Sequence, residues 1–270
     1  MRNAVTLKKF TDDIPNEDSF HCGKNFIAIS DGAGGCGLFA RQWSRYLVEH
    51  IPEEPIKSYE CFDKWVDSIW EPFYKKYEKE AKEHDGIFLS KFYSEGACAT
   101  IAVVWKTEEN KYEWISYGDS VIFHYNKKTQ KLEHSFTCLK DFMNPPFLIS
   151  CKDPLSKDGF RQGTFETDDR SVVFACSDTL AHFVLMMFMA TNYTDYKKEL
   201  DDIINLKNHN SSYVAVAKAL YEKNIDRIIS LLETAVESDV EFENIVKKWY
   251  SMGLIDVDDY TLAFIKKYNC

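Results

Sequence analysis

The sequence predicts an α+β fold, a four-layer α-β-β-α sandwich of two central antiparallel sheets flanked by helices. Short apolar runs with strand character occur near both ends and in the middle of the chain. Two blocks with helical periodicity separate these runs, and the strand candidates of the middle follow one another through short polar turns. Strands and helices that are segregated in this order favour a layered α+β protein over alternating β-α-β units.

The first elements are two strands and two helices. Residues 3–10 (NAVTLKKF) and 25–30 (NFIAIS) predict strands, and the second is apolar throughout, which is typical of a central strand. From Leu38 to Ile51 an apolar residue recurs every four positions, which predicts a helix with one buried face. A second helix is expected from Tyr59 to His84, with a kink or break at Pro72.

The middle of the chain changes to strand periodicity. Four strand candidates are joined by short polar turns, and we expect them to pair consecutively as an antiparallel meander. They are residues 96–105, 111–118, 120–126 and 131–136. Residues 138–168 show no sustained period and contain scattered prolines and glycines, so we expect an irregular, flap-like excursion over the surface.

The last part of the chain returns to the core. Residues 171–177 (SVVFACS) predict a strand, helical patterns fill residues 179–252, and residues 260–268 (YTLAFIKKY) predict a final strand. A chain of 270 residues with 45% hydrophobic content can bury a sizeable core. We therefore expect one domain spanning residues 1–270.

Composition excludes several classes of protein. No apolar run approaches the ~20 residues of a membrane span, and residues 1–10 lack the apolar core of a signal peptide. We therefore expect a cytoplasmic protein without a membrane partner. A net charge of −10 and the absence of a dense Lys/Arg cluster argue against a nucleic-acid partner. The eight cysteines form no CxxC pair and are expected to be buried thiols.

The run FIAISDGAGGCG (residues 26–37) allows several interpretations. Gly32, Gly34 and Gly37 satisfy G-x-G-x-x-G, the dinucleotide fingerprint, but no second parallel strand ending in a ribose-binding acid follows the helix. A P-loop would need a lysine after these glycines, and the chain has none there. A plain strand-to-helix turn would explain the glycines and leave Asp31 unexplained.

Carboxylates recur where apolar strands begin or end. An ionised carboxylate at such a place is costly unless it is paired or binds a cation. Beside Asp31, the residues concerned are Glu17, Asp18, Asp119, Asp178, Asp256, Asp258 and Asp259. Carboxylate, carbonyl and water oxygens are the ligands that Mg²⁺ and Mn²⁺ prefer, whereas zinc favours histidine and thiolate. The pattern therefore favours a magnesium or manganese site.

The same positions carry a family resemblance. The motifs NEDSF, SDGAGGCG, EGACAT, YGDS, CSDTL and DDYT, in this order between residues 16 and 264, resemble those of the metal-dependent protein phosphatases, the protein phosphatase 2C family. Each motif is short, and their shared order carries the resemblance. It implies a phosphatase that hydrolyses phosphoserine and phosphothreonine in a phosphoprotein substrate through a metal-activated water, without a covalent intermediate.

The resemblance also implies roles for single residues. Two Mn²⁺ or Mg²⁺ ions are expected, with a weaker third. Asp31 would bridge the two ions, Asp178 and Asp258 would hold the first, and the Gly32 carbonyl and Glu17 would serve the second. Asp18 would lie in the water-bridged shell, Asp119 would hold the third ion, and Asp259 takes the place of an asparagine in the family pattern.

The chain departs from the family pattern at three positions. Asp13 stands where many members have a phosphate-binding arginine, and Lys8 and Lys9 are the nearest substitutes. Ala33 replaces a histidine, and Thr179 replaces a glycine. These departures keep open an alternative, a catalytically weak pseudophosphatase that binds phosphopeptides or acts as a scaffold. We expect a monomer in either case, with substrate choice residing in the excursion at 138–168.

Overall fold

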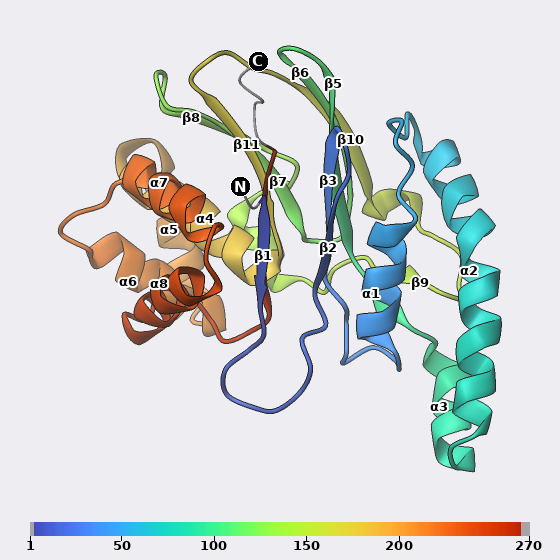
Figure 1. The fold of residues 1–270 in the computed structure, drawn as a ribbon. Coiled ribbons are helices and arrows are strands. Elements are labelled where there is room, and N and C mark those ends of the chain that lie inside the picture. The colour runs from blue at the N-terminus through green and yellow to red at the C-terminus, as the bar shows by residue number, and fades with distance from the viewer. Residues whose placement is uncertain (1–2, 266–270) are drawn as a thin grey trace.

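The computed structural model describes residues 3–265 and contains two five-stranded antiparallel sheets that face each other. Figure 1 shows the sheets at the centre, with helices on both outer sides. The first sheet has the order β1 (Ala4–Leu7), β12 (Tyr260–Ile265), β11 (Ser171–Cys176), β7 (Val121–Asn126), β8 (Lys131–His134). The second has the order β10 (Phe160–Glu166), β6 (Lys111–Tyr117), β5 (Ile101–Glu108), β3 (Phe26–Ser30), β2 (Ser19–Cys22).

The helices form the two outer layers. The second sheet is covered by α1 (Ala40–Glu49), α2 (Tyr59–Lys82) and α3 (Gly86–Glu95). The first sheet is covered by α4 (Asp178–Thr191), α5 (Tyr193–Asn205), α6 (His209–Ala219), α7 (Ile225–Ala235) and α8 (Asp239–Ser251). The predicted four-layer α+β sandwich is therefore confirmed.

Strand β3 shows why the layers form. All five of its residues are buried. Phe26 and Ala28 pack toward the helices α1 and α2, whereas Ile27 and Ile29 pack between the sheets. Successive side chains of a strand point to opposite faces, so a strand with a layer on each side must be apolar at every position. The prediction of a central, doubly buried strand from its continuous apolar run is confirmed.

The predicted meander is wrong at one turn. β5 pairs with β6 and β7 pairs with β8, but β6 and β7 belong to different sheets. The chain crosses between the sheets through the turn Gly118–Asp119–Ser120, where Gly118 has a φ of +97°. A side chain rarely adopts this left-handed conformation, so glycine permits the crossing. The run 96–105 is also divided, into β4 (Cys98–Ala99) and β5.

The segment 138–168 is only partly irregular. It contains the 3₁₀ turns η1 (Leu139–Met143) and η2 (Lys157–Gly159), the short strand β9 (Ile149–Ser150), and the full strand β10. Strand β10 lies at the edge of the second sheet, and of its residues only Phe165 is fully buried. An edge strand with so little buried surface has no strong apolar alternation, which explains why the sequence pattern missed it.

Other predictions meet mixed outcomes. Helix α2 runs through Pro72 without a break, and β2 and α3 were not predicted.

All the described cysteines are free thiols, but Cys36 and Cys61 are exposed and not buried. The helical block at 179–252 is confirmed as α4 to α8. Residues 266–268 of the last predicted strand lie outside the described residues. No helix of the described chain has the length and apolar character needed to cross a membrane.

Candidate active site

Strand register brings the acidic motifs of the first sheet to one end of the sandwich. Cys176, the last residue of β11, pairs with Val121 in β7 and with Leu262 in β12. Because these pairs are antiparallel, the residues that follow β11 and those that precede β7 and β12 meet at the same edge. Those residues include Asp178, Asp119 and Asp258.

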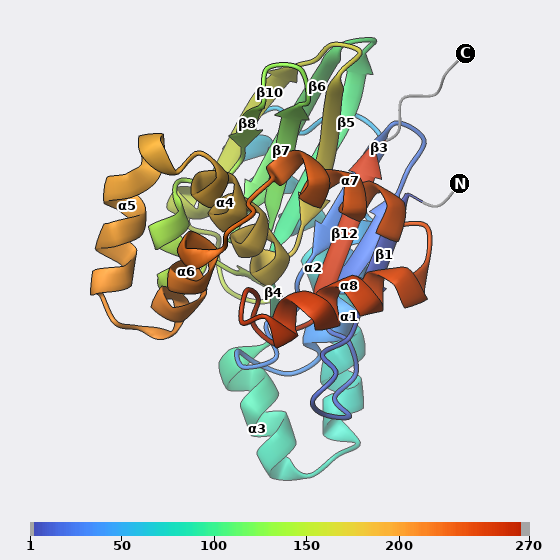
Figure 2. The same cartoon turned by 90° about the vertical axis from the view of Figure 1, so that its left-hand side faces the viewer.

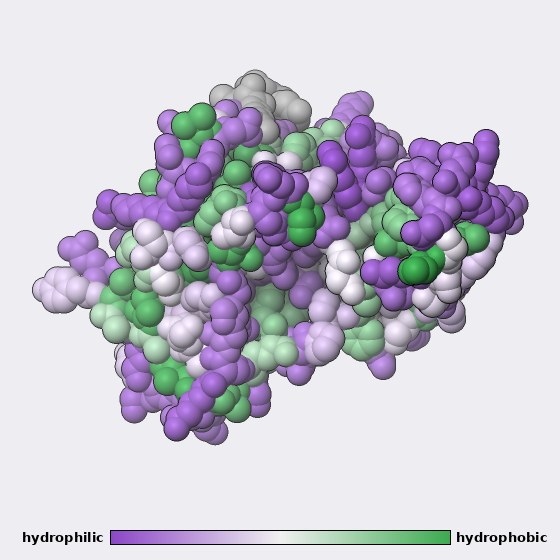
Figure 3. Space-filling model, turned by 90° about the horizontal axis from the view of Figure 1, so that it is seen from below, coloured by the Kyte–Doolittle hydropathy of each residue, from purple (hydrophilic) through white to green (hydrophobic). Residues whose placement is uncertain are grey.

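The second sheet brings its own motifs to the same end. Ser19 at the start of β2 pairs with Ser30 at the end of β3, so Glu17 and Asp18 lie beside Asp31. The loop that joins β1 to β2 hangs below the sheets at the bottom of Figure 1. Figure 3 views the molecule from this end and shows a mostly hydrophilic face with apolar residues in scattered groups.

Asp31 is fixed by hydrogen bonds to Thr100, the residue between β4 and β5. The Asp31 N–H donates to the Thr100 hydroxyl at 3.2 Å, and the Thr100 N–H donates to the Asp31 carbonyl at 2.8 Å. The Thr100 hydroxyl also lies 2.7 Å from the hydroxyl of Ser120. The end of β3 is thereby tied to the turn that carries Asp119.

Glycines let the loop after Asp31 pack against Glu17. A Cβ at Gly32 would lie 2.7 Å from the Glu17 carbonyl oxygen, and a Cβ at Gly34 would lie 2.1 Å from the Glu17 carboxylate oxygen Oε2. Neither approach is possible with a side chain in place. The glycine-rich run therefore serves close packing around an acidic residue, and the dinucleotide and P-loop interpretations have no support in this geometry.

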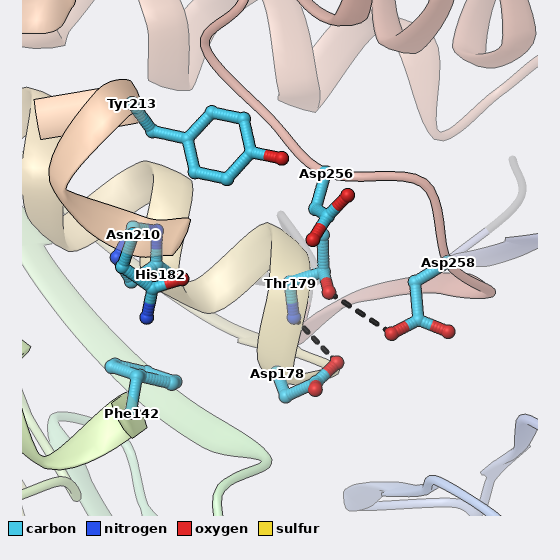
Figure 4. Close-up of a pocket in the computed structure, with 8 residues that line it drawn as sticks. All are labelled: Phe142, Asp178, Thr179, His182, Asn210, Tyr213, Asp256 and Asp258. Carbon is cyan, nitrogen blue, oxygen red and sulfur yellow. Dashed lines mark hydrogen bonds between the residues drawn. The ribbon is translucent and has the colours of Figure 1, made fainter. Parts of the chain in front are cut away.

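Thr179 links two of the predicted metal-binding aspartates. Its hydroxyl donates to Asp258 Oδ2 at 3.1 Å, and its N–H donates to the carboxylate of Asp178 (Figure 4). These residues form one side of a cavity of about 160 Å³. The other residues that line it are Phe142, His182, Asn210, Tyr213 and Asp256. Thr179, which takes the place of the family's glycine, contacts both carboxylates.

Burial and mutual repulsion raise the pKa values of the acidic residues. For Asp31, Asp18 and Asp178, burial is the largest cause, and neighbouring carboxylates add to it. Burial raises the pKa of Asp119 to about 6, with Asp258 adding to the shift and Arg161 opposing it. The pKa values of Asp258 and Glu17 are also raised, chiefly by burial. Such a cluster of carboxylates is stabilised by nearby positive charge.

The two lysines predicted to bind substrate differ in their surroundings. Lys9 lies close enough to Glu17 and Asp258 to lower the pKa of each, against the upward effect of burial. Lys8 instead donates to the Asp12 carbonyl at 3.3 Å and lies 3.9 Å from the carboxylate of Asp13. Of the two, only Lys9 is near the acidic cluster.

Asp259, predicted in the place of a family asparagine, serves the backbone. Its carboxylate accepts from the Lys9 N–H at 2.7 Å and from the Glu17 N–H at 2.7 Å. It is only 5% exposed. Asp259 therefore fastens both ends of the loop between β1 and β2 to the segment before β12 that carries Asp258. The carboxylate of Asp256 instead contacts the ring Nε2 of His209.

Asp18 and Asp119 hold buried carboxylate oxygens that could face a divalent ion. Both carboxylate oxygens of Asp18 and Oδ1 of Asp119 are buried without a hydrogen-bond partner. Buried polar atoms normally have partners, so these oxygens suit an ion or its bound water. Within residues 3–265 no group of three or more Asp, Glu, His or Cys side chains is arranged closely enough to hold a metal ion. The oxygen chemistry and the unpartnered atoms fit Mg²⁺ or Mn²⁺.

Comparison with known proteins gives results for structure and none for sequence. No protein-family model matches the chain, and no curated protein matches it by sequence. Among solved structures, the Mycobacterium tuberculosis serine/threonine phosphatase PstP superposes with a TM-score of 0.54 at 12% identity, covering 98% of this chain and 99% of that one. The serine/threonine phosphatase Stp1 from Staphylococcus aureus gives 0.50 at 13% identity, over 99% and 96%.

The chain has the protein phosphatase 2C fold. A structure of the PstP catalytic domain in complex with two manganese ions also matches, with a TM-score of 0.52 at 13% identity, covering 98% of each chain. The superpositions, and not the low sequence identities, establish this fold. The fold predicted from the resemblance is confirmed.

Two residues near the cluster were not predicted. Thr100 belongs to the motif EGACAT, and its hydroxyl accepts a hydrogen bond from the Asp31 N–H. Apart from that motif, nothing in the sequence indicated this contact. Arg161 in β10 donates to the Gly118 carbonyl at 3.0 Å and lies over the ring of Phe136 at 5.1 Å. Because β10 itself was missed, nothing in the sequence pattern placed Arg161 next to the turn that carries Asp119.

Proposed function

We propose that the protein is a metal-dependent serine/threonine phosphoprotein phosphatase. The observation that carries the proposal is the meeting of Asp31, Asp178 and Asp258, from three distant parts of the chain, at one end of a protein phosphatase 2C fold. Repulsion from Asp258 adds to the raised pKa of both Asp31 and Asp178, in keeping with the strand ends that these residues share. The retention of these acids supports an enzyme over a scaffold.

The residues that would hold the metal ions are those that the family resemblance implies. Asp178 and Asp258 would hold a first Mn²⁺ or Mg²⁺ ion, Asp31 would be shared, and Glu17 and the Gly32 carbonyl would serve a second. Asp18 would lie in the water-bridged shell, and Asp119 would hold a weaker third ion. When bound, two divalent ions lower the pKa of water and offset the charge of a phosphoryl group.

The chain's own residues would orient this assembly. Thr179 and the Asp259 N–H hold the two carboxylate oxygens of Asp258 by hydrogen bonds. Asp259 and Thr100 hold the two loops that carry Glu17 and Asp31. Lys9, near Glu17 and Asp258, is the cation best placed to attract an anionic phosphomonoester, in place of the arginine that Asp13 replaces.

The substrate, the oligomeric state and the cellular location of the protein are also proposals. We infer a phosphoserine or phosphothreonine protein as substrate, because the structural neighbours are serine/threonine phosphatases. We further propose a cytoplasmic monomer of one domain that acts without nucleic acid or membrane, in keeping with its net charge of −10. The segment 138–168 contributes Phe142 to the cavity beside Asp178, so it is placed to influence substrate choice.

The test combines metal binding with turnover. Calorimetric titration with Mn²⁺ is followed by assays on p-nitrophenyl phosphate and on a phosphothreonine peptide. We expect binding, metal-dependent hydrolysis, and loss of hydrolysis in Asp31→Asn. Asp67→Asn, which alters an exposed carboxylate on α2 and not in the acidic cluster, is the control. Hydrolysis that survives Asp31→Asn would refute the mechanism, and metal binding without turnover would favour the pseudophosphatase.

A further inference from the structure

A groove of about 470 Å³ lies in the outer helical layer of the first sheet, and it includes none of the acidic residues of the candidate active site. Its walls come from α7, from the end of α8 and from the segment between α6 and α7. Figure 2 shows α7 and α8 beside each other across β12 and β1. The floor includes Phe183 of α4 and Trp249 of α8, whose ring centroids are 4.3 Å apart.

The rim of this groove exposes apolar side chains. Tyr221 is 100% exposed, Met252 is 41% exposed and Leu231 is 39% exposed. Single exposed apolar residues are common on protein surfaces, but a group of them around a concave apolar floor is typical of a binding site for another molecule.

The same rim carries unpaired positive charge. Lys223, Arg227 and Lys248 all line the groove, and none has an ion-pair partner in the part of the chain that the structure describes. One carboxylate, Glu222, lies on the same rim. By contrast, Lys247, the neighbour of Lys248, pairs with Glu243 at 2.6 Å. A local excess of cations on a chain of net charge −10 creates a surface that attracts anionic groups.

We propose that this groove docks a segment of a partner protein in which apolar side chains are flanked by carboxylates. The apolar side chains would contact the floor at Phe183 and Trp249, and the carboxylates would pair with Lys223, Arg227 and Lys248. An amphipathic segment in an apolar groove is a recurring mode of peptide recognition. The occupant is a protein segment and not a lipid surface because the apolar floor is concave, and a planar membrane reaches only the rim.

The test selects peptides and does not depend on catalysis. A displayed library of random peptides of about twelve residues is selected on the immobilised full chain, with counter-selection on the variant K223E/R227E/K248E. We expect enrichment of sequences that combine Leu, Phe or Trp with neighbouring Asp or Glu. Binding of the leading peptide, measured by fluorescence anisotropy, should weaken at least about tenfold in the triple variant.

A matched control separates the groove from general charge. Lys247→Glu makes the same change of charge as Lys248→Glu on the adjacent residue, outside the groove. It should leave peptide binding within about twofold of the original, whereas Lys248→Glu alone should weaken it severalfold. Thermal unfolding followed by circular dichroism verifies that each variant is folded.

Several results would overturn the proposal. These are enrichment of peptides without acidic residues, no enrichment at all, and equal binding to the triple variant and the original chain. A fourth is sedimentation with phosphatidylserine vesicles that the triple substitution abolishes, combined with no selected peptide, which would assign the surface to a membrane. Because binding is measured without metal or turnover, a failed phosphatase assay leaves this test intact.

Discussion

The carboxylate of Asp259 accepts a hydrogen bond from the backbone N–H of Glu17 at 2.7 Å, across 242 residues of chain. Its other oxygen accepts from the Lys9 N–H at 2.7 Å. One buried side chain thus holds both ends of the loop between β1 and β2 against the segment that carries Asp258. The Ser44 hydroxyl also donates to the Glu17 carbonyl, so Asp259 and Ser44 together position Glu17 for the candidate metal site.

Removal of this carboxylate is expected to cost stability and metal affinity together. Asp259→Ala leaves two backbone N–H groups without their acceptor, and we expect the free energy of unfolding to fall by about 2 kcal/mol or more. Urea unfolding measures this change, and Mn²⁺ titration should show weaker binding. Asp13→Ala, an exposed aspartate of the same loop, should change neither. An Asp259→Ala variant as stable as the original chain would show that other contacts hold the loop.

Thr179 provides a second prediction, about the departure from the family's glycine. Thr179→Val keeps the shape of the side chain and removes the hydroxyl that donates to Asp258 Oδ2. Loss of one such bond to a charged group should weaken Mn²⁺ binding by about 1–2 kcal/mol, or roughly five- to thirtyfold. Thr179→Ser retains the hydroxyl and should bind Mn²⁺ nearly as well as the original. Equal weakening in both variants would point to the methyl group instead.

His182 leads to a prediction about pH. Its ring is 8% exposed, its Nε2 has no hydrogen-bond partner, and burial lowers its pKa to about 4. The unfolded chain protonates this histidine near its ordinary pKa of about 6.5, while the folded chain resists protonation until pH falls to about 4. Above about pH 6.5 the histidine therefore costs no stability. As pH falls from about 6.5 to about 4, the free energy of unfolding falls, because the unfolded chain takes up a proton that the folded chain does not.

Replacement of His182 by a group that does not titrate should remove this loss. Between about pH 7.5 and pH 5, the free energy of unfolding of the original chain should fall by about 2 kcal/mol more than that of His182→Gln. Comparison of the two chains cancels the opposite contribution of the carboxylates with raised pKa values, whose protonation favours the metal-free folded state. Urea unfolding at both pH values, in the presence of a chelator, measures the difference. Parallel pH profiles for the two chains would contradict the prediction.

The sequence predicted the elements whose residues show a period. β3 was predicted because both of its faces are buried, and α1 because Trp43 and Leu47 repeat on one buried face. β10 was not predicted because an edge strand buries little. The crossing between β6 and β7 was not predicted because two strands joined by a short turn usually pair with each other, and only the φ of Gly118 marks the exception.

Some features of the candidate site could likewise be predicted from the sequence, and others could not. The acids at strand ends could be predicted from local pattern and resemblance, and the structure brings Asp31, Asp178 and Asp258 close together. The roles of Asp259 and Thr100 could not be predicted, since each depends on a backbone group far away in sequence. Lys8 and Lys9 were equivalent by sequence, and only the path of the loop turns Lys8 toward Asp13.

The glycine-rich loop gives the final prediction, in which two adjacent glycines serve as test and control. A Cβ at Gly34 would lie 2.1 Å from Oε2 of Glu17, whereas a Cβ at Gly35 would meet no atom within 4 Å. The conflict at Gly34 is with the end of a flexible side chain. Gly34→Ala should therefore displace the Glu17 carboxylate and cost little folding free energy.

Displacement of Glu17 should be measurable as weaker metal binding. We expect Gly34→Ala to lower the affinity for Mn²⁺ by about tenfold, or roughly 1.4 kcal/mol, with the loss confined to the ion that Glu17 serves. Gly35→Ala should match the original chain in both titration and thermal unfolding. If the two alanine variants bind Mn²⁺ equally well, Glu17 does not contribute to the site. If Gly34→Ala instead unfolds at a much lower temperature, the loop matters for folding and the glycine has no specific role toward metal.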